Sequence, residues 1–108
     1  MALPTKNRLK SKTDFNDVFK KGHAVKGSFL LVKYKKHSNL FPRFGFIIPA
    51  RVVKRAVDRN KVKRFLTQQV QRVAYSFKGH DVIIILSKNA GHPVLAHELE
   101  TLLFKIIK

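Results

Sequence analysis

The spacing of apolar residues near the N-terminus predicts a short amphipathic helix. Phe15, Val18 and Phe19 follow one another at intervals of three residues and one residue, which places them on one face of a helix. Thr13 is suited to cap the start of this helix, and Gly22 is suited to end it. The pattern therefore predicts a helix between Thr13 and Gly22.

Apolar and polar side chains then follow the two-residue period of β-strands. The run SFLLVKYKK, at residues 28–36, places alternate side chains on opposite faces of a strand. One face carries Leu30, Val32 and Tyr34, and the other carries Phe29, Leu31, Lys33 and Lys35. After a turn-prone segment, the run RFGFII predicts a second strand between Pro42 and Pro49.

The second half of the chain predicts a helix, a strand and a further helix. A long helix is expected over residues 52–77, where Val62 and Leu66 belong to one apolar stripe. The run DVIIILS, at residues 81–87, is apolar on both faces and predicts a buried central strand. Residues 92–108 carry Leu and Ile at helical spacing and predict an amphipathic helix.

The predicted order of elements, α-β-β-α-β-α, indicates one small domain. Its length fits a single domain over residues 1–108, in which residues 1–12 form a basic arm. The order predicts an α/β sandwich, with helices packed on a small central mixed sheet. A strand, a long helix and another strand in succession indicate that the second and third predicted strands are parallel.

The charge of the chain indicates a polyanionic partner. Its 23 Lys and Arg residues against six Asp and Glu give a net charge of +17 and a pI of about 10.8. Such an excess on a small domain causes self-repulsion, which a nucleic acid relieves. The segment KRAVDRNKVKR, residues 54–64, has six basic side chains and one acid, Asp58. A solvated helix face is the ordinary explanation of such a segment, but the shortage of acids throughout the chain favours contact with phosphates.

Other chemistry has little support in the residues. There is no Cys, which removes disulfides, thiolate metal sites and Cys nucleophiles. The carboxylates are scattered, and His23, His37 and His80 fall in predicted turns, so we expect no metal site and no cofactor held by the protein alone. The longest apolar run, Val82 to Leu86, is too short to cross a membrane, and the basic N-terminus lacks the apolar core of a signal peptide. We therefore expect a cytoplasmic protein with no membrane partner.

The most basic segment also carries a family motif. Residues 56–64 read Ala-x-x-Arg-Asn-Lys-Val-Lys-Arg, on a helix that follows a Gly-containing strand. This resembles the signature of the bacterial ribonuclease P protein family, which has Arg-Asn-basic-aliphatic-basic-Arg at this spacing. The basic arm, the pattern of the first helix and the predicted strands agree with the family in order, so the resemblance covers nearly the whole chain. One departure is Thr67, where the family commonly has a further Arg or Lys.

The resemblance implies an RNA-binding subunit without catalytic residues of its own. In this family a catalytic RNA removes the 5′ leader from precursor tRNA, using Mg²⁺ bound at its phosphates, and one protein is expected per RNA. The protein is expected to dock on that RNA through the motif helix and to contact the single-stranded leader between its first helix and its sheet. The family fold also implies a left-handed crossover between the two parallel strands.

Three groups of residues are the candidate contacts. The RNA-docking group contains the basic residues and the Asn in and before the motif: Arg51, Lys54, Arg55, Arg59, Asn60, Lys61, Lys63 and Arg64. Their cations can neutralise phosphates, which positions an RNA without reading its sequence. The leader cleft implied by the resemblance has aromatic and apolar walls: Phe15, Phe19, Leu30, Val32 and Tyr34. The basic arm contributes Lys6, Arg8 and Lys10.

Two alternatives stay open from the residues themselves. Core packing explains Phe15 and Phe19 more simply than leader contact does, and only the resemblance favours the leader. The charge alone also fits a stand-alone basic RNA-binding module of the ribosome-associated type. Such a module would bind many RNAs similarly and would leave the cleavage of precursor tRNA unaffected.

Overall fold

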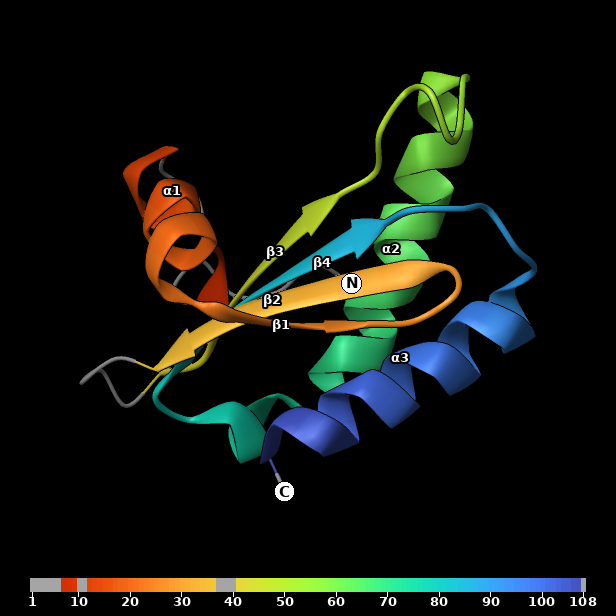
Figure 1. The fold of residues 1–108 in the computed structure, drawn as a ribbon. Helices are drawn as coiled ribbons and strands as arrows, with labels where there is room; N and C mark the ends of the chain where they lie inside the picture. The colour runs from red at the N-terminus through yellow and green to blue at the C-terminus, as the bar shows by residue number, and fades with distance from the viewer. Residues whose placement is uncertain (1–6, 10–11, 37–40, 108) are drawn as a thin grey trace.

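The computed structural model describes residues 7–9, 12–36 and 41–107. It contains three α-helices, four strands and a short 3-10 helix in the order α1 (Lys12–Lys21), β1 (His23–Lys26), β2 (Leu30–Lys36), β3 (Arg43–Ile47), α2 (Ala56–Gln71), η2 (Ala74–Phe77), β4 (His80–Leu86) and α3 (His92–Ile107). Figure 1 shows these elements as a layered structure around one sheet. No helix among the described residues has the length and apolar character needed to cross a membrane.

The four strands form one mixed sheet in the order β1-β2-β4-β3. β2 is antiparallel to both β1 and β4, whereas β3 and β4 are parallel, as the strand-helix-strand order predicted. The prediction that the run DVIIILS is a buried central strand is also confirmed, because Val82, Ile83 and Ile84 of β4 are fully buried. The expected α/β sandwich is therefore the observed architecture.

The register of the sheet aligns side chains from three strands in rows. Arg43 of β3 pairs with Asp81 of β4, which pairs with Lys35 of β2. The next row on the same face consists of Gly45, Ile83 and Lys33, and the third row consists of Ile47, Ile85 and Leu31. Because successive side chains along a strand point to opposite faces, these three rows share one face of the sheet.

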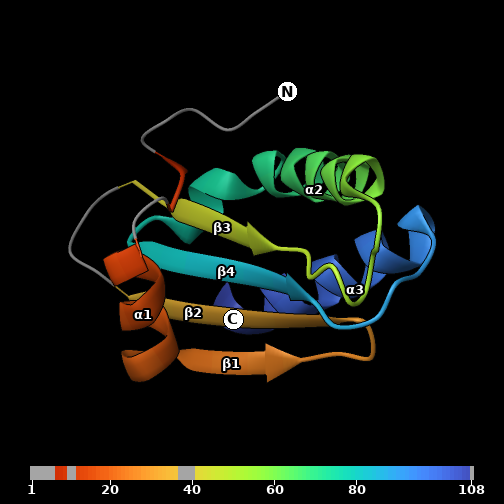
Figure 2. The same ribbon diagram turned by 90° about the horizontal axis from the view of Figure 1, so that it is seen from above.

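Helices cover the two faces of the sheet unequally. α2 and α3 pack on one face, where their Leu and Val side chains join Leu30, Val32, Phe44 and the even-numbered residues of β4 in the main core. α1 lies across one end of the strands on the opposite face (Figure 2), where Val18 packs with Leu9 and Ile83 in a smaller cluster. Each fully buried Leu or Val contributes about 1.5–3 kcal/mol relative to exposure. The main core therefore dominates the stability, and α1 is held by less apolar surface.

The structure contains one strand that the pattern did not predict. β1 is four residues long, mostly exposed and placed at the edge of the sheet. Its residues, HAVK, offer no alternation of apolar and polar side chains, and pairing with β2 is what makes them a strand. The predicted order α-β-β-α-β-α is therefore incomplete by one strand.

Three predicted helix boundaries are also wrong. The long helix was expected from residue 52, but the N–H groups of Val52 and Val53 donate to the carbonyl of Pro49, and α2 begins at Ala56. It ends at Gln71 rather than near residue 77, where η2 follows it. α1 already includes residue 12, so Thr13 lies within its first turn and is not its cap.

Candidate nucleic-acid interface

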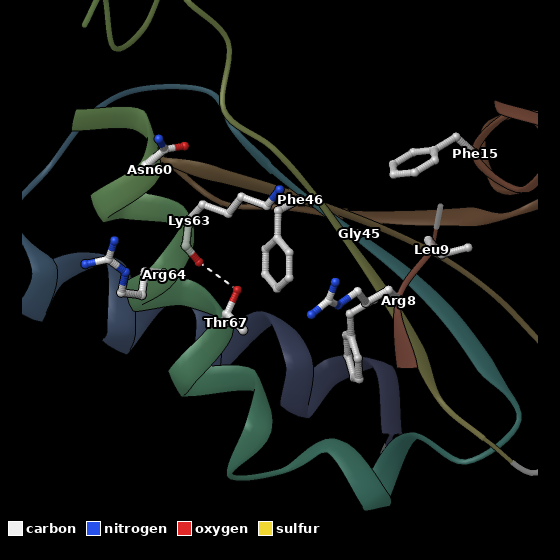
Figure 3. A pocket seen from close by; sticks show the side chains of 10 residues that line it. Arg8, Leu9, Phe15, Gly45, Phe46, Asn60, Lys63, Arg64 and Thr67 are labelled. Carbon is white, nitrogen blue, oxygen red and sulfur yellow. Dashed lines mark hydrogen bonds between the residues drawn. The ribbon is translucent and has the colours of Figure 1, made fainter. Parts of the chain in front are cut away.

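One face of α2 lines a cleft of about 430 Å³ beside the edge strand β3. Asn60, Lys63, Arg64 and Thr67 contribute to it from the helix, at the i, i+3, i+4 and i+7 positions of one stripe. Figure 3 shows Lys63 pointing from α2 toward Phe46 of β3. Three residues of the predicted RNA-docking group, together with Thr67, therefore lie on one wall of a single cleft, which we call the β3-edge cleft.

The opposite wall of the β3-edge cleft comes from the N-terminal segment, from β3 and from α1. Arg8 and Leu9 line it, and the segment is fixed there because the Leu9 N–H donates to the Phe44 carbonyl at 2.9 Å. Asn7 Nδ2 donates to the Pro42 carbonyl at 2.7 Å beside this contact. The described part of the predicted basic arm is thus paired with the edge of the sheet, opposite the motif helix. Lys6 and Lys10, also predicted for this arm, lie outside the described residues.

Gly45 allows α1 to approach this wall closely. A Cβ atom at position 45 would lie 2.5 Å from Cζ of Phe15 and 3.3 Å from Cβ of Leu9, so only glycine leaves room for both side chains. Phe15 lines the β3-edge cleft as a half-buried ring from α1. Phe15 therefore packs against the sheet and also borders the cleft, so both of its predicted roles fit its position.

The rest of the RNA-docking group lies around the start of α2. Arg59 Nη1 donates to the carbonyl oxygens of Val53 and Lys54, at 3.0 and 2.8 Å, and so ties the helix to the preceding loop. Lys61, Arg55 and Lys54 line a second, open groove beside His92 of α3. Arg51 is exposed on the loop before the helix. The motif therefore presents cations on two sides of α2, and Arg59 orders the loop that carries some of them.

Part of the predicted leader cleft lies on the wrong face of the sheet. Leu30 and Val32 are fully buried under α2 and α3, and Tyr34 packs against the same core. The prediction that these three residues border a cleft below α1 is therefore wrong. These three residues of β2 point into the main core, because α2 and α3 both pack on that face of the sheet.

The face of β2 below α1 instead carries Leu31, Lys33 and Lys35. Lys33 Nζ lies 4.8 Å from the centroid of the Phe19 ring, a cation–π contact, and Phe19 keeps 37% of its surface exposed. A basic residue beside an exposed aromatic ring is suited to a nucleobase with its phosphate. Lys33 and Gly45 were missed as site residues, although the charged character of the second face of β2 was a usable signal for Lys33.

A partly buried ion pair lies beside the site. Arg43 donates from Nε and Nη2 to both oxygens of Asp81, and this hydrogen bonding raises the pKa of Arg43 despite its partial burial. Among the described residues, no three His, Asp or Glu side chains gather where they could hold a metal ion. Two His residues expected in turns lie elsewhere: His23 opens β1 and His80 opens β4. His37 lies outside the described residues.

The chemistry of the β3-edge cleft suits a phosphodiester chain. Its lining residues include three cations, Arg8, Lys63 and Arg64, and no carboxylate. Asn60 adds a group that can donate and accept hydrogen bonds, and Phe15 and Phe46 add ring faces. Thr67, which stands where a further cation was expected, is buried and donates to the Lys63 carbonyl at 2.7 Å. It lines the cleft as a short neutral side chain.

Known proteins resemble this chain along most of its length. A family model described as Ribonuclease P matches residues 3–107. The ribonuclease P protein component of Pseudanabaena sp. is 32% identical, over 95% of this chain and 93% of that protein. The same component from Nostoc punctiforme is also 32% identical, over 95% of this chain and 93% of its own length.

Solved structures show the same fold. The RNase P protein of Staphylococcus aureus superposes with a TM-score of 0.83 and 27% identity, covering 94% of this chain and 95% of that one. The RNase P protein of Thermotoga maritima, at 24% identity, superposes with a TM-score of 0.78 over 88% of this chain and 93% of its own.

Proposed function

Because the chain belongs to the ribonuclease P protein family, we propose that it acts as the protein subunit of a ribonuclease P holoenzyme. In this role it binds the catalytic RNA and the 5′ leader of precursor tRNA. It thereby assists the endonucleolytic removal of the leader, which matures the 5′ end of the tRNA. We further propose one protein per catalytic RNA, working in the cytoplasm.

The observation that carries this proposal is the continuity of the β3-edge cleft. It joins the motif residues Asn60, Lys63 and Arg64 to Arg8 of the arm and Phe15 of α1 in one concave surface. An RNA bound along α2 would therefore lie next to a strand bound under α1. A subunit that bridges a fixed RNA and a variable leader needs this arrangement of a docking surface beside a sequence-tolerant groove.

The leader groove that we propose differs from the one expected from the sequence. It runs between α1 and the rows of β2, β4 and β3 that face this helix. Phe15 and Phe19 form one side, and Lys33 adds a cation next to the Phe19 ring. Leu31 and Ile85 pair in the next row of the same face, where they would extend the groove along the sheet. Aromatic faces with basic flanks bind single strands with little preference for sequence, as variable leaders require.

The chemical step is assigned to the RNA in this proposal. The residues around the cleft bind and orient phosphates, and none of the lining side chains is a carboxylate that could serve as a general base or as a metal ligand. The described residues do not fit a protein-held Mg²⁺ site, so we derive no step through a metal held by the protein. Mg²⁺ of the holoenzyme is accordingly proposed to sit on RNA phosphates.

Reconstitution tests the proposed function. The chain is combined with catalytic RNA of a bacterial ribonuclease P at low Mg²⁺, and the cleavage of a precursor tRNA with a labelled leader is followed. We expect the protein alone to cleave nothing and the mixture to release the leader faster than the RNA alone. If the protein changes neither the rate nor the affinity for the precursor, the chain is a stand-alone RNA-binding module.

A further inference from the structure

We propose that Arg43 and Lys35 clamp α1 to the sheet through Asp14 and Asp17, and that this clamp positions Phe15 and Phe19 for the leader. The four charged residues are positioning residues, because they act on the leader only through the placement of α1. The inference rests on the leader contact proposed above and adds the device that sets its geometry.

The first half of the clamp is a network centred on Arg43 of β3. Its guanidinium donates from Nε and Nη2 to the two carboxylate oxygens of Asp81 in β4, at 2.8 and 2.7 Å. This is the bidentate geometry of strong Arg–carboxylate pairs. The third nitrogen, Nη1, donates to Oδ2 of Asp14 in α1 at 3.3 Å. Only 4% of the Asp81 side-chain surface is exposed, so this buried carboxylate holds the Arg43 guanidinium in one orientation. A rigid cation is thereby presented to the N-terminal half of α1.

The second half of the clamp lies at the other end of the same row of the sheet. Lys35 of β2 stands beside Asp81 in the register, on the side away from Arg43. Its Nζ atom lies 3.8 Å from Oδ2 of Asp17. Asp14 and Asp17 are three residues apart, and so lie on one side of α1. The two acids of the helix therefore meet two cations placed on either side of a buried acid.

The contacts of α1 with the row of Arg43, Asp81 and Lys35 determine where its aromatic side chains lie on the sheet. The adjacent row of the sheet consists of Gly45, Ile83 and Lys33. Phe15 lies over Gly45, and Phe19 lies beside Lys33. A helix that shifted by one row would lose both of these placements together.

The clamp matters because α1 has little else to fix its orientation. Val18 is its one buried side chain and Phe15 is half-buried beside it, and so small an apolar contact leaves a helix free to tilt and rotate. The C-terminal end of α1 is pinned at Gly22, where a Cβ atom would lie 2.5 Å from the Tyr34 carbonyl oxygen. The N-terminal half, which carries Phe15, therefore depends on the contact of Asp14 with Arg43.

The test uses Asp14→Asn in the reconstituted holoenzyme. The measurement is the ratio of the KM for precursor tRNA to the inhibition constant of mature tRNA, which isolates the leader. Because the ion pair is partly exposed, we expect the preference for precursor to fall by about two- to fivefold, with kcat unchanged. Asp14→Glu, which keeps the carboxylate, should restore most of the preference. Asp17→Asn should act in the same direction as Asp14→Asn.

A matched control removes the same charge elsewhere. Glu100→Gln, on the exposed side of α3, raises the net charge by one as Asp14→Asn does. Charge alone would strengthen RNA binding in both variants equally, so a loss of precursor preference in Asp14→Asn alone supports the clamp. Equal ratios in folded Asp14→Asn, Asp17→Asn and Glu100→Gln, checked by circular dichroism, overturn it. A wild-type holoenzyme that does not prefer precursor at all refutes the proposed leader contact instead.

Discussion

Arg59 and Lys63 are one helical turn apart in α2, yet their side chains make different contacts. Arg59 donates to two loop carbonyls within the protein, whereas Lys63 is exposed and lines the β3-edge cleft. Both belong to the motif, and a count of cations treats them as equal. The structure indicates that Arg59 first orders the loop carrying Arg51 and Lys54, while Lys63 is available for a phosphate.

This difference predicts distinct effects of two alanine variants. Lys63→Ala should lower the slope of log affinity against log salt for the catalytic RNA by about one, with an unchanged free energy of unfolding. Arg59→Ala should weaken docking and also lower the free energy of unfolding by about 1 kcal/mol, because two carbonyls lose a charged donor. Filter binding across a salt series and urea unfolding measure the two quantities.

Lys105→Ala serves as the control, since it removes an exposed cation from α3, away from the cleft. It should leave the salt slope almost unchanged. A slope that falls equally in Lys63→Ala and Lys105→Ala would mean that affinity follows net charge, and the β3-edge cleft would not be the docking surface.

Individual site residues were predictable only where their chemistry differs from that of the core. The cations of the motif could be named from the sequence because a Lys or Arg on a helix face is rarely buried. Leu30 and Val32 could not be assigned to the correct face, since alternation shows that a strand has two faces but not which one meets the larger helices. Lys33 is the residue that the same alternation would have favoured had the apolar face been assigned to the core.

At the scale of elements, Glu98 joins α3 to the hairpin between β1 and β2. Its carboxylate accepts hydrogen bonds from the backbone N–H groups of Ser28, Phe29 and Leu30. The bonds from Phe29 and Leu30 are 2.8 and 3.0 Å long. Gly27 leaves the space for this carboxylate, which a Cβ atom would occupy. The edge strand β1, which has few apolar contacts of its own, is therefore held in the fold partly by a side chain about 70 residues away.

Glu98→Gln should destabilise the fold while leaving RNA docking intact. The amide has one acceptor oxygen in place of two and turns N–H groups toward the backbone donors, so we expect a loss of about 1–3 kcal/mol in the free energy of unfolding. Urea denaturation measures it, with Glu100→Gln as the matched control. Similar unfolding curves for the two variants would show that the hairpin does not depend on this carboxylate.

The elements themselves were predictable to the extent that they bury apolar residues periodically. β4, α2 and α3 supply the main core and could be recognised from the sequence. β1 could not, because its exposed residues are a strand only through pairing with β2. The start of α2 was missed for a similar reason: Val52 and Val53 are apolar and no helix-breaking residue follows them, but their N–H groups complete a turn after Pro49.

At the scale of the whole molecule, the acids and the cations are used for different purposes. Asp14, Asp17, Asp58 and Asp81 each pair with a Lys or Arg of the same chain, so they are partly neutralised within the protein. With 23 cations against six acids, most of the positive charge is left for a partner. Three of these four acids thus take part in the contacts between α1 and the sheet, and a surplus of cations remains for a polyanionic partner.

In the holoenzyme that we propose, α1 faces the leader while α2 faces the catalytic RNA. Because the chain has no Cys, a single introduced Cys is a unique attachment point for a photocrosslinker. Asn16→Cys on α1, Gln68→Cys on α2 and Thr101→Cys on α3 are all at exposed positions. Each variant is reconstituted with catalytic RNA and a precursor tRNA labelled in its leader. We predict crosslinks to the leader from position 16, to the catalytic RNA from position 68, and to neither from position 101. Leader crosslinks from position 101 but not from position 16, in holoenzymes that still cleave, would contradict the account.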